Sequence, residues 1–114
     1  MTTPPPLGDF EQLVLLALVR LGDTAYGVAI HAEIMERAAR DVSVAAVYKT
    51  LERLEDKGFA ASSLGEPTAE RGGRRKKFFR IQPAGRRALR HAIAALRRMG
   101  DGLTADLDLA ADES

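Results

Sequence analysis

Cationic side chains are concentrated in one part of the chain. Residues 71–100 carry eleven Lys and Arg and no Asp or Glu, whereas residues 1–70 carry six basic and eleven acidic side chains. Residues 101–114 add five acidic side chains and no basic one, so the net charge of +1 conceals the basic block. Uncompensated cations favour a polyanionic partner, either nucleic acid or an anionic membrane surface. The alternative is a solvated basic helix face that the acidic segments neutralise.

Catalytic and metal-binding groups are missing from the sequence. The chain has no cysteine, which excludes a disulfide framework, a thiol nucleophile and a Cys-based zinc site. His31 and His91 have no second ligand at metal spacing and are expected to be exposed helix residues, and Ser62-Ser63 has no nearby base. The stretch from Arg71 to Arg74 lacks the spacing of a nucleotide-binding loop. We therefore expect no cofactor, no metal and no enzymatic activity.

One predicted helix has a surface suited to DNA. Ser43 is typical of an N-cap and Gly58 of the residue that follows a helix. Apolar spacing predicts a buried stripe of Val44, Val47, Leu51 and Leu54. The other side should expose Ala45, Ala46, Lys49, Thr50 and Arg53. In the major groove, alanines allow close approach and contact thymine methyls, and Lys and Arg reach guanine O6 and N7. Tyr48 flanks this side, where its hydroxyl could reach a phosphate or its ring could be half-buried.

A turn-rich loop follows between two β-compatible runs, residues 59–64 and 76–81. The loop and the start of the second run carry the cations Arg71, Arg74, Arg75, Lys76 and Lys77, and Gly72 and Gly73 form a sharp turn among them. On a loop, such cations contact phosphates and add affinity more than sequence readout. Phe78 and Phe79 could stack on unpaired bases, but at least one of them is expected in the core.

The predicted order of elements is that of a winged helix-turn-helix, a mainly α (α+β) fold with a two-stranded wing. Two helices, residues 10–21 and 26–39, precede the one after Ser43; Gly22 ends the first, and Asp23 or Thr24 is expected to cap the second. This domain should span residues 9–82. Residues 1–8 are expected to be a flexible arm, because three consecutive prolines prevent a helix.

A last helix is predicted from Pro83, with apolar residues at heptad spacing. The preceding domain is expected to have no surface left to cover this stripe, so a second copy of the chain should cover it. The alternative is a helix that lies along its own domain. The expected dimer interface is Leu89, Ile93, Leu96, Met99, Gly100, Leu103 and Leu107, within a helix over residues 83–109, followed by an acidic tail over residues 110–114. Gly100 and Gly102 disfavour helix, so whether the helix continues past Gly100 or kinks and frays there is left open.

These motifs resemble the short members of the PadR family of transcriptional regulators, from about Leu7 to Leu107. The resemblance is carried by Leu7-Gly-x-Phe-Glu-x-Leu-Val-Leu-Leu16, Ala25-Tyr-Gly-Val-Ala-Ile30, Asp41-Val-Ser-x-x-x-Val-Tyr-x-Thr-Leu-x-Arg-Leu-Glu55, Lys57-Gly58, Gly72-Gly-Arg-Arg-Lys76 and Pro83-Ala-Gly85. It implies a homodimeric repressor that binds double-stranded DNA at a palindromic operator. The expected DNA-binding residues are Tyr26, Ser43, Ala45, Ala46, Tyr48, Lys49, Thr50, Arg53, Arg71, Gly72, Gly73, Arg74, Arg75 and Lys76.

Some short relatives bind planar drugs with aromatic residues of the last helix. Here no aromatic residue follows Phe79, so such a pocket is not expected, whereas an aliphatic pocket for an unidentified small-molecule effector stays open. Residues 13–19 are too short to cross a membrane, and Asp9 and Glu11 stand where a signal peptide would be basic. We expect a cytoplasmic protein without a membrane partner. The alternative function is a winged-helix protein-interaction module that does not read DNA.

Overall fold

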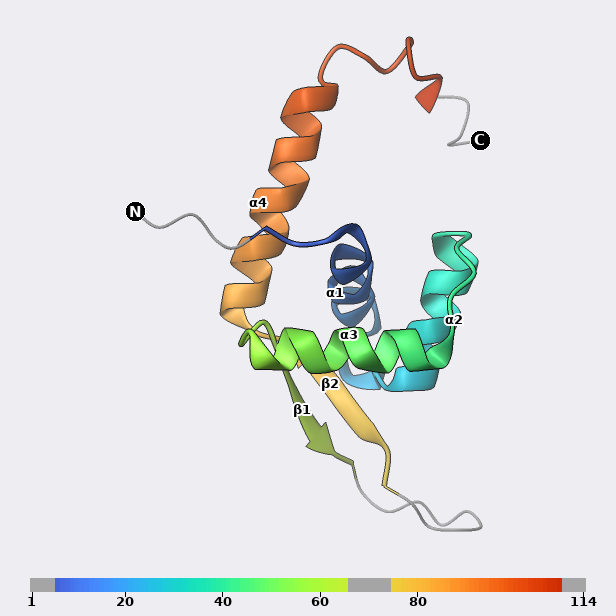
Figure 1. Cartoon of the computed structure of the whole chain (residues 1–114), viewed down its shortest axis with the longest axis vertical. Coiled ribbons are helices and arrows are strands. Elements are labelled where there is room, and N and C mark those ends of the chain that lie inside the picture. The colour runs from blue at the N-terminus through green and yellow to red at the C-terminus, as the bar shows by residue number, and fades with distance from the viewer. Residues whose placement is uncertain (1–5, 66–74, 110–114) are drawn as a thin grey trace.

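The computed structural model describes residues 6–65 and 75–109. These residues form four α-helices, one short 3₁₀ turn and two strands (Figure 1). Their order confirms the predicted winged helix-turn-helix with a two-stranded wing and a C-terminal helix. The elements are α1 (Asp9–Leu21), η1 (Gly22–Thr24), α2 (Gly27–Arg37), α3 (Val44–Asp56), β1 (Ala60–Leu64), β2 (Lys77–Ile81) and α4 (Pro83–Gly100).

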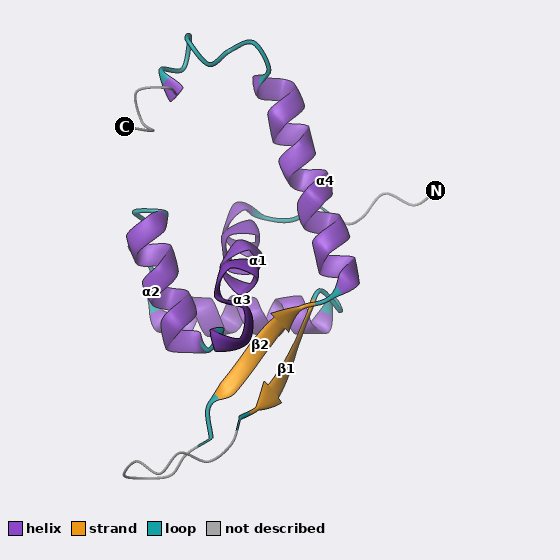
Figure 2. Ribbon diagram, turned by 180° about the vertical axis from the view of Figure 1, so that it is seen from behind, coloured by secondary structure: helices purple, strands orange, loops and turns teal. Residues whose placement is uncertain are grey.

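Helix α1 lies in the middle of the domain, and α2, α3 and the start of α4 pack around it (Figure 2). Its side chains Val14, Leu15, Ala17 and Leu18 are buried, whereas Leu16 and Val19 are 37% and 43% exposed, so one apolar side of this helix is left uncovered. The chain is held before residue 9, contrary to the expected arm over residues 1–8. Leu7 packs against the core, and the Gly8 amide donates a hydrogen bond of 2.9 Å to Glu11 Oε1. The rest of that arm, residues 1–5, lies outside the described residues.

Helix α2 begins later than predicted and without the predicted cap. Tyr26 is its N-cap residue, and no side chain caps it. The Thr24 hydroxyl instead donates 2.7 Å to the Leu21 carbonyl and closes the η1 turn. Asp23 and Thr24 are therefore not caps, because Ala25 and Tyr26 separate them from α2. Ala25 and Tyr26 run beside β2, where the Phe79 amide donates a hydrogen bond of 2.8 Å to the Ala25 carbonyl.

The ends of α3 are as predicted, but its buried side is not. Ser43 Oγ accepts a hydrogen bond of 3.0 Å from the Ala46 amide, and Gly58 has φ +77°. Val47, Leu51 and Leu54 are fully buried, whereas Val44 in the first turn is 38% exposed. Thr50, expected on the exposed side, is buried. At about 100° per residue Thr50 lies beside Leu54, so the buried stripe is wider than the apolar spacing alone indicates.

The two strands pair antiparallel, with Ala60 opposite Ile81 and Leu64 opposite Lys77. Phe79 is buried, which confirms that one of the two phenylalanines belongs to the core, and Phe78 is half-buried. The strands lead directly into α4, whose Gly85 touches the backbone of Phe59 so closely that a Cβ would overlap the Phe59 carbonyl. A glycine is required at this crossing. The start of α4 is therefore held against the base of the wing.

Helix α4 is covered by its own domain only at its start. Leu89 is buried in the core and Ile93 packs against it, whereas Leu96 is 65% and Met99 79% exposed. Helix α1 of the same chain already covers the turn of α4 that carries Leu89, and the dimer interface predicted along this helix stays a prediction. The helix also ends at Gly100 rather than at residue 109. Glycine disfavours helix, and Gly102 has φ +83°, so Leu103 and Leu107 lie in turns beyond the helix.

The acidic tail over residues 110–114 lies outside the described residues. Within the described ranges, no helix combines the length and the apolar character that crossing a membrane requires.

Candidate nucleic-acid interface

The first half of α3 carries the candidate recognition surface. Ala45 and Lys49 are exposed, Ala46 is half-buried and Tyr48 is 39% exposed. The second half is different, because Glu52 and Asp56 are exposed there and would repel phosphates. Glu52 and Asp56 are visible in the sequence and limit the surface that was predicted from its cations and alanines. The surface suited to an anionic partner is thus confined to the first two turns of α3.

Tyr48 ties α3 to α2 and to the wing. Its ring meets Phe79 edge-on at 6.5 Å between centroids, and its hydroxyl lies against Gly27 at the start of α2. A Cβ at residue 27 would overlap the phenol, so only glycine leaves room for it. The Tyr48 ring is therefore half-packed and half-exposed, and its position is set by three elements at once.

The base of the wing is built on Tyr26. Its ring meets Phe78 edge-on at 5.8 Å, and Lys76 Nζ lies 4.4 Å from the centroid of the Tyr26 ring. A cation over an aromatic face is attracted by the negative face of the ring. Tyr26 thus contacts the wing through its ring and holds the ammonium group of Lys76 beside it. Lys77 has a different neighbour, Glu55 Oε1 at 3.9 Å.

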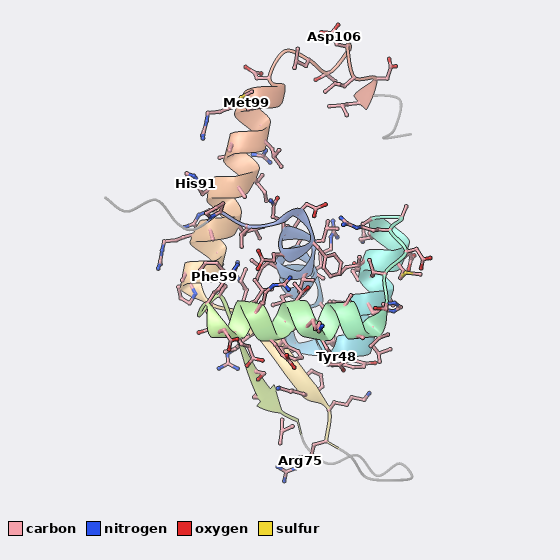
Figure 3. All side chains as sticks on the ribbon, in the orientation of Figure 1. Tyr48, Phe59, Arg75, His91, Met99 and Asp106 are labelled. Atoms are coloured by element: carbon pink, nitrogen blue, oxygen red, sulfur yellow. The ribbon has the colours of Figure 1, made fainter. Side chains whose placement is uncertain are left out.

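Arg75 is exposed at the described end of the wing, on the side of the molecule opposite Met99 (Figure 3). The other predicted wing residues, Arg71, Gly72, Gly73 and Arg74, lie outside the described residues. Among the predicted wing cations, the described part of the chain therefore contains Arg75, Lys76 and Lys77.

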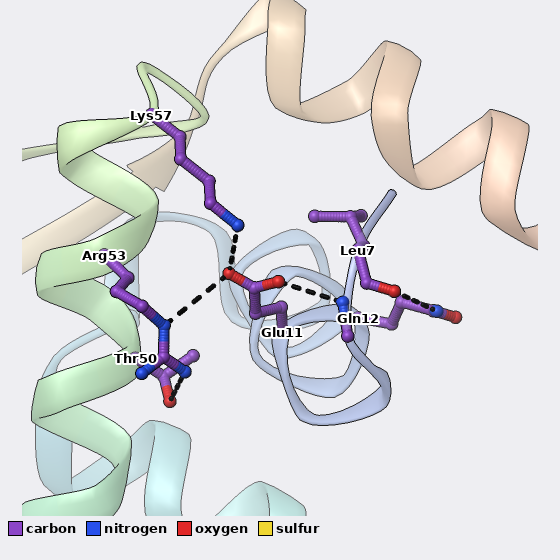
Figure 4. A network of polar contacts seen from close by, with 7 residues as sticks. Leu7, Glu11, Gln12, Thr50, Arg53 and Lys57 are labelled. Atoms are coloured by element: carbon purple, nitrogen blue, oxygen red, sulfur yellow. Dashed lines mark hydrogen bonds and ion pairs between the residues drawn. The ribbon is translucent and has the colours of Figure 1, made fainter. Parts of the chain in front are cut away.

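Arg53 has a partner that the sequence did not reveal. Its Nε lies 3.8 Å from Glu11 Oε2, its Nη2 donates to Thr50 Oγ1 at 3.4 Å, and Lys57 Nζ donates to Glu11 Oε2 at 2.7 Å (Figure 4). The Glu11 side chain is only 8% exposed. We name this group, Glu11 with Arg53 and Lys57, the α1–α3 clamp. It draws Arg53 toward α1, away from the exposed turns that carry Ala45 and Lys49.

Opposing effects act on the Glu11 carboxyl. Burial raises its pKa, but the hydrogen bonds from Lys57 and the Gly8 amide and the charges of Lys57 and Arg53 outweigh burial. The pKa of Glu11 therefore lies below its ordinary value of 4.5. The sequence signal for the clamp was an acidic residue directly before the apolar run of α1.

A histidine holds the segment that enters α3. The Nε2 atom of His31, on α2, lies 2.7 Å from the Val42 carbonyl oxygen. A carbonyl only accepts, so the proton of this hydrogen bond is on Nε2. His31 is half-buried rather than an exposed helix residue as predicted. The described residues contain no cluster of three or more His, Cys, Asp or Glu side chains placed to hold a metal ion.

The family model of the transcriptional regulator PadR-like family matches residues 15–91, which include α2, α3, the wing strands and the first half of α4. The chain belongs to the PadR-like family. It is thus a transcriptional regulator of a family that binds DNA, and not an enzyme. No curated protein matches the chain.

Solved structures support the same fold for this PadR-like chain. A PadR family regulator from Eggerthella lenta is 28% identical, with a TM-score of 0.64 over 84% of this chain and 81% of that one. A PadR family regulator from Clostridium difficile is 19% identical, with a TM-score of 0.67 over 86% and 98%. A transcriptional regulator from Clostridium thermocellum is 23% identical, with a TM-score of 0.67 over 83% and 86%. The last two establish likeness of fold alone.

Proposed function

We propose that this PadR-like protein binds a palindromic operator as a homodimer and represses the adjacent gene. The observation that carries the proposal is that the chain exposes two surfaces suited to DNA. One is the first two turns of α3, and the other is the pair of wing cations Arg75 and Lys76. Ala45 and Lys49 would enter the major groove and read base edges. Arg75 and Lys76 would contact the phosphates beside the groove.

The homodimer is supported by the outer half of α4. Leu96 and Met99 are the most exposed large apolar side chains of the described residues, at 65% and 79%. Both lie on one side of a helix whose first half is already packed on the domain, so an identical helix from a second copy is the natural cover. A two-fold axis between two such helices would place one α3 on each half of a palindromic site.

Repression is the simplest consequence of this architecture. The described residues form the winged domain, α4 and the short segment after it. A dimer seated on an operator that overlaps a promoter blocks transcription by occupying the DNA.

The experiment that tests the proposal is selection of bound fragments from the organism's own DNA, followed by titration at several salt concentrations. We expect a palindrome, and an affinity whose logarithm changes with the logarithm of salt by about 0.9 per phosphate contacted. Placing the palindrome over a reporter promoter should lower expression when the protein is present. Weak salt dependence without preference for any palindrome would instead indicate a protein-interaction module.

A further inference from the structure

A groove between α1 and α2 has no cover in the described chain. It forms a cavity of about 240 Å³ at the edge of the core, whose residues Ala17 and Ile34 are part of its lining. Its floor is apolar, with Leu13, Leu16, Ala17 and Ile34, and its rim carries Arg20 and Arg37. Small-molecule sites usually measure roughly 300–1,000 Å³, so this groove is better suited to one or two apolar side chains of a peptide.

The segment after α4, residues 101–109, has the complementary character. Its leucines Leu103, Leu107 and Leu109 are 41%, 56% and 45% exposed. Between and before them stand Asp101, Asp106 and Asp108, and the segment contains no basic residue. In Figure 3 Asp106 lies in the loop beyond the end of α4, apart from the winged domain. This segment therefore exposes apolar and acidic side chains together, without a surface to pack on.

The charges of groove and segment are opposite. Arg37 already pairs with Glu33, which also lines the groove, through an ion pair of 2.9 Å on α2. Arg20 has no ion-pair partner among the described residues. An aspartate of the segment would give Arg20 a partner at the edge of an apolar contact, where the charge is less screened than in open solvent.

We propose that the segment 101–109 of a second copy occupies the α1–α2 groove, with leucines on the floor and an aspartate at Arg20. The proposal rests on the homodimer proposed above. The segment continues directly from Leu96 and Met99, so a second copy whose α4 covers these residues is brought next to it. Within one chain the α1–α2 groove is open and the leucines of the segment are exposed. This favours an arrangement in which the segment of each copy fills the groove of the other. Under two-fold symmetry both grooves are filled in the same way.

The test uses the absence of native cysteine from the full chain. One chain carries Leu16→Cys in the groove, and a second, differently tagged chain carries Leu107→Cys in the segment. Co-expressed and oxidised, they should give a disulfide-linked product that contains both tags and has twice the mass of a single chain. The matched control replaces Leu16→Cys by Leu64→Cys, an exposed leucine on β1, and should lose this product. Ala38→Cys with Leu109→Cys is a second pair at exposed positions. It tests the same contact if the first pair does not fold.

Two results would overturn the proposal. One is that neither pair yields more mixed product than the Leu64→Cys control. The other is that a chain with both Leu16→Cys and Leu107→Cys links to itself and runs as a single chain, because the segment would then fill its own groove. Light scattering and operator binding of the cysteine-free protein distinguish a failure of the segment docking from a failure of the proposed homodimer. A dimer that binds operator without the cross-link refutes only the docking of the segment, and a monomer refutes the homodimer as well.

Discussion

Glu11 is a charged residue in a helix that is otherwise buried on most sides. Its carboxylate is tolerated there because the Gly8 amide, Lys57 and Arg53 surround it. The two cations come from the second half of α3, so this carboxylate links the central helix to the candidate recognition helix. Both cations are partly exposed, and this moderates what the pairs contribute to stability. The contribution should nevertheless exceed that of a surface pair, since one partner is buried.

Replacing Glu11→Gln should lower the free energy of unfolding by roughly 1.5–3 kcal/mol, the range for hydrogen bonds to charged groups. The amide keeps the shape and one acceptor but leaves Lys57 without an opposite charge. Urea denaturation measures the loss. The matched control is Glu36→Gln, an exposed residue of α2, which should stay within about 0.5 kcal/mol of the parent. Equal stability of both variants would mean that the clamp contributes nothing.

The pH dependence should carry the same signature. Because the pKa of Glu11 is lower in the folded chain than its ordinary 4.5, the unfolded chain binds more protons on acidification. The stability from Glu11 is complete above pH 4.5 and is lost as pH falls through the lower, folded value. The Arg40 guanidinium, 2.7 Å away, lowers the pKa of Asp9 in the same sense. The free energy of unfolding of Glu11→Gln should therefore fall less steeply than that of the parent as the pH is lowered below 4.5. That of Glu36→Gln should fall as steeply as the parent's.

Lys49 is the exposed cation of α3 that the clamp does not engage. Lys49→Ala should weaken binding to the operator by about 1–3 kcal/mol more than binding to random DNA, because a base contact discriminates and a phosphate contact does not. Fluorescence anisotropy on both DNAs measures the two losses. Arg98→Ala, an exposed cation on α4, is the control and should change neither. Equal losses for Lys49→Ala on both DNAs would assign Lys49 to the phosphates.

At the scale of elements, local signals were sufficient for the types and order of helices and strands. Ser43 and Gly58 mark the ends of α3 because capping depends on neighbouring residues only. The clamp could not be read in this way, since Glu11 and Lys57 are separated by 46 residues. Thr50 was misplaced for a related reason, because the width of a buried stripe depends on the helices packed against it. The burial of Leu89 against α1 could not be read from spacing either, because it is a property of the fold.

The wing is the element whose contribution can be measured by salt. Replacing Arg75→Gln and Lys76→Gln together removes two charges per subunit while leaving the strand pairing intact. If all four sites of a dimer contact phosphate, the magnitude of the salt slope should fall by about 3–4, since each contact is worth about 0.9. The operator preference should persist.

The control for the wing is the pair Arg97→Gln and Arg98→Gln, which removes the same charge from α4. Its slope should equal that of the parent. An unchanged slope in the wing variant would mean that Arg75 and Lys76 do not touch DNA. A loss that depends on the A·T content flanking each half-site would instead show an arginine reading the width of the minor groove.

At the scale of the whole molecule, α4 performs two tasks along its length. Its first turns close the core of the winged domain through Ala88 and Leu89. Eighteen residues at 1.5 Å each make a helix of about 27 Å, which carries Leu96 and Met99 beyond that core. Figure 1 shows this outer half projecting away from α1, α2 and α3. The apolar stripe thus continues past the surface that its own domain offers.

Substitutions along α4 should therefore separate folding from assembly. Leu96→Asp with Met99→Asp should give folded monomers by light scattering, with the helical content and the unfolding transition of the winged domain retained, because both residues are exposed in the single chain. Leu89→Asp should unfold the domain, since it places an unpaired charge in the core. Leu64→Asp, at a leucine of β1 that is 61% exposed, is the control and should remain dimeric. A dimer of undiminished affinity in the Leu96 and Met99 variant would move the interface away from the outer half of α4, toward the exposed side of α1.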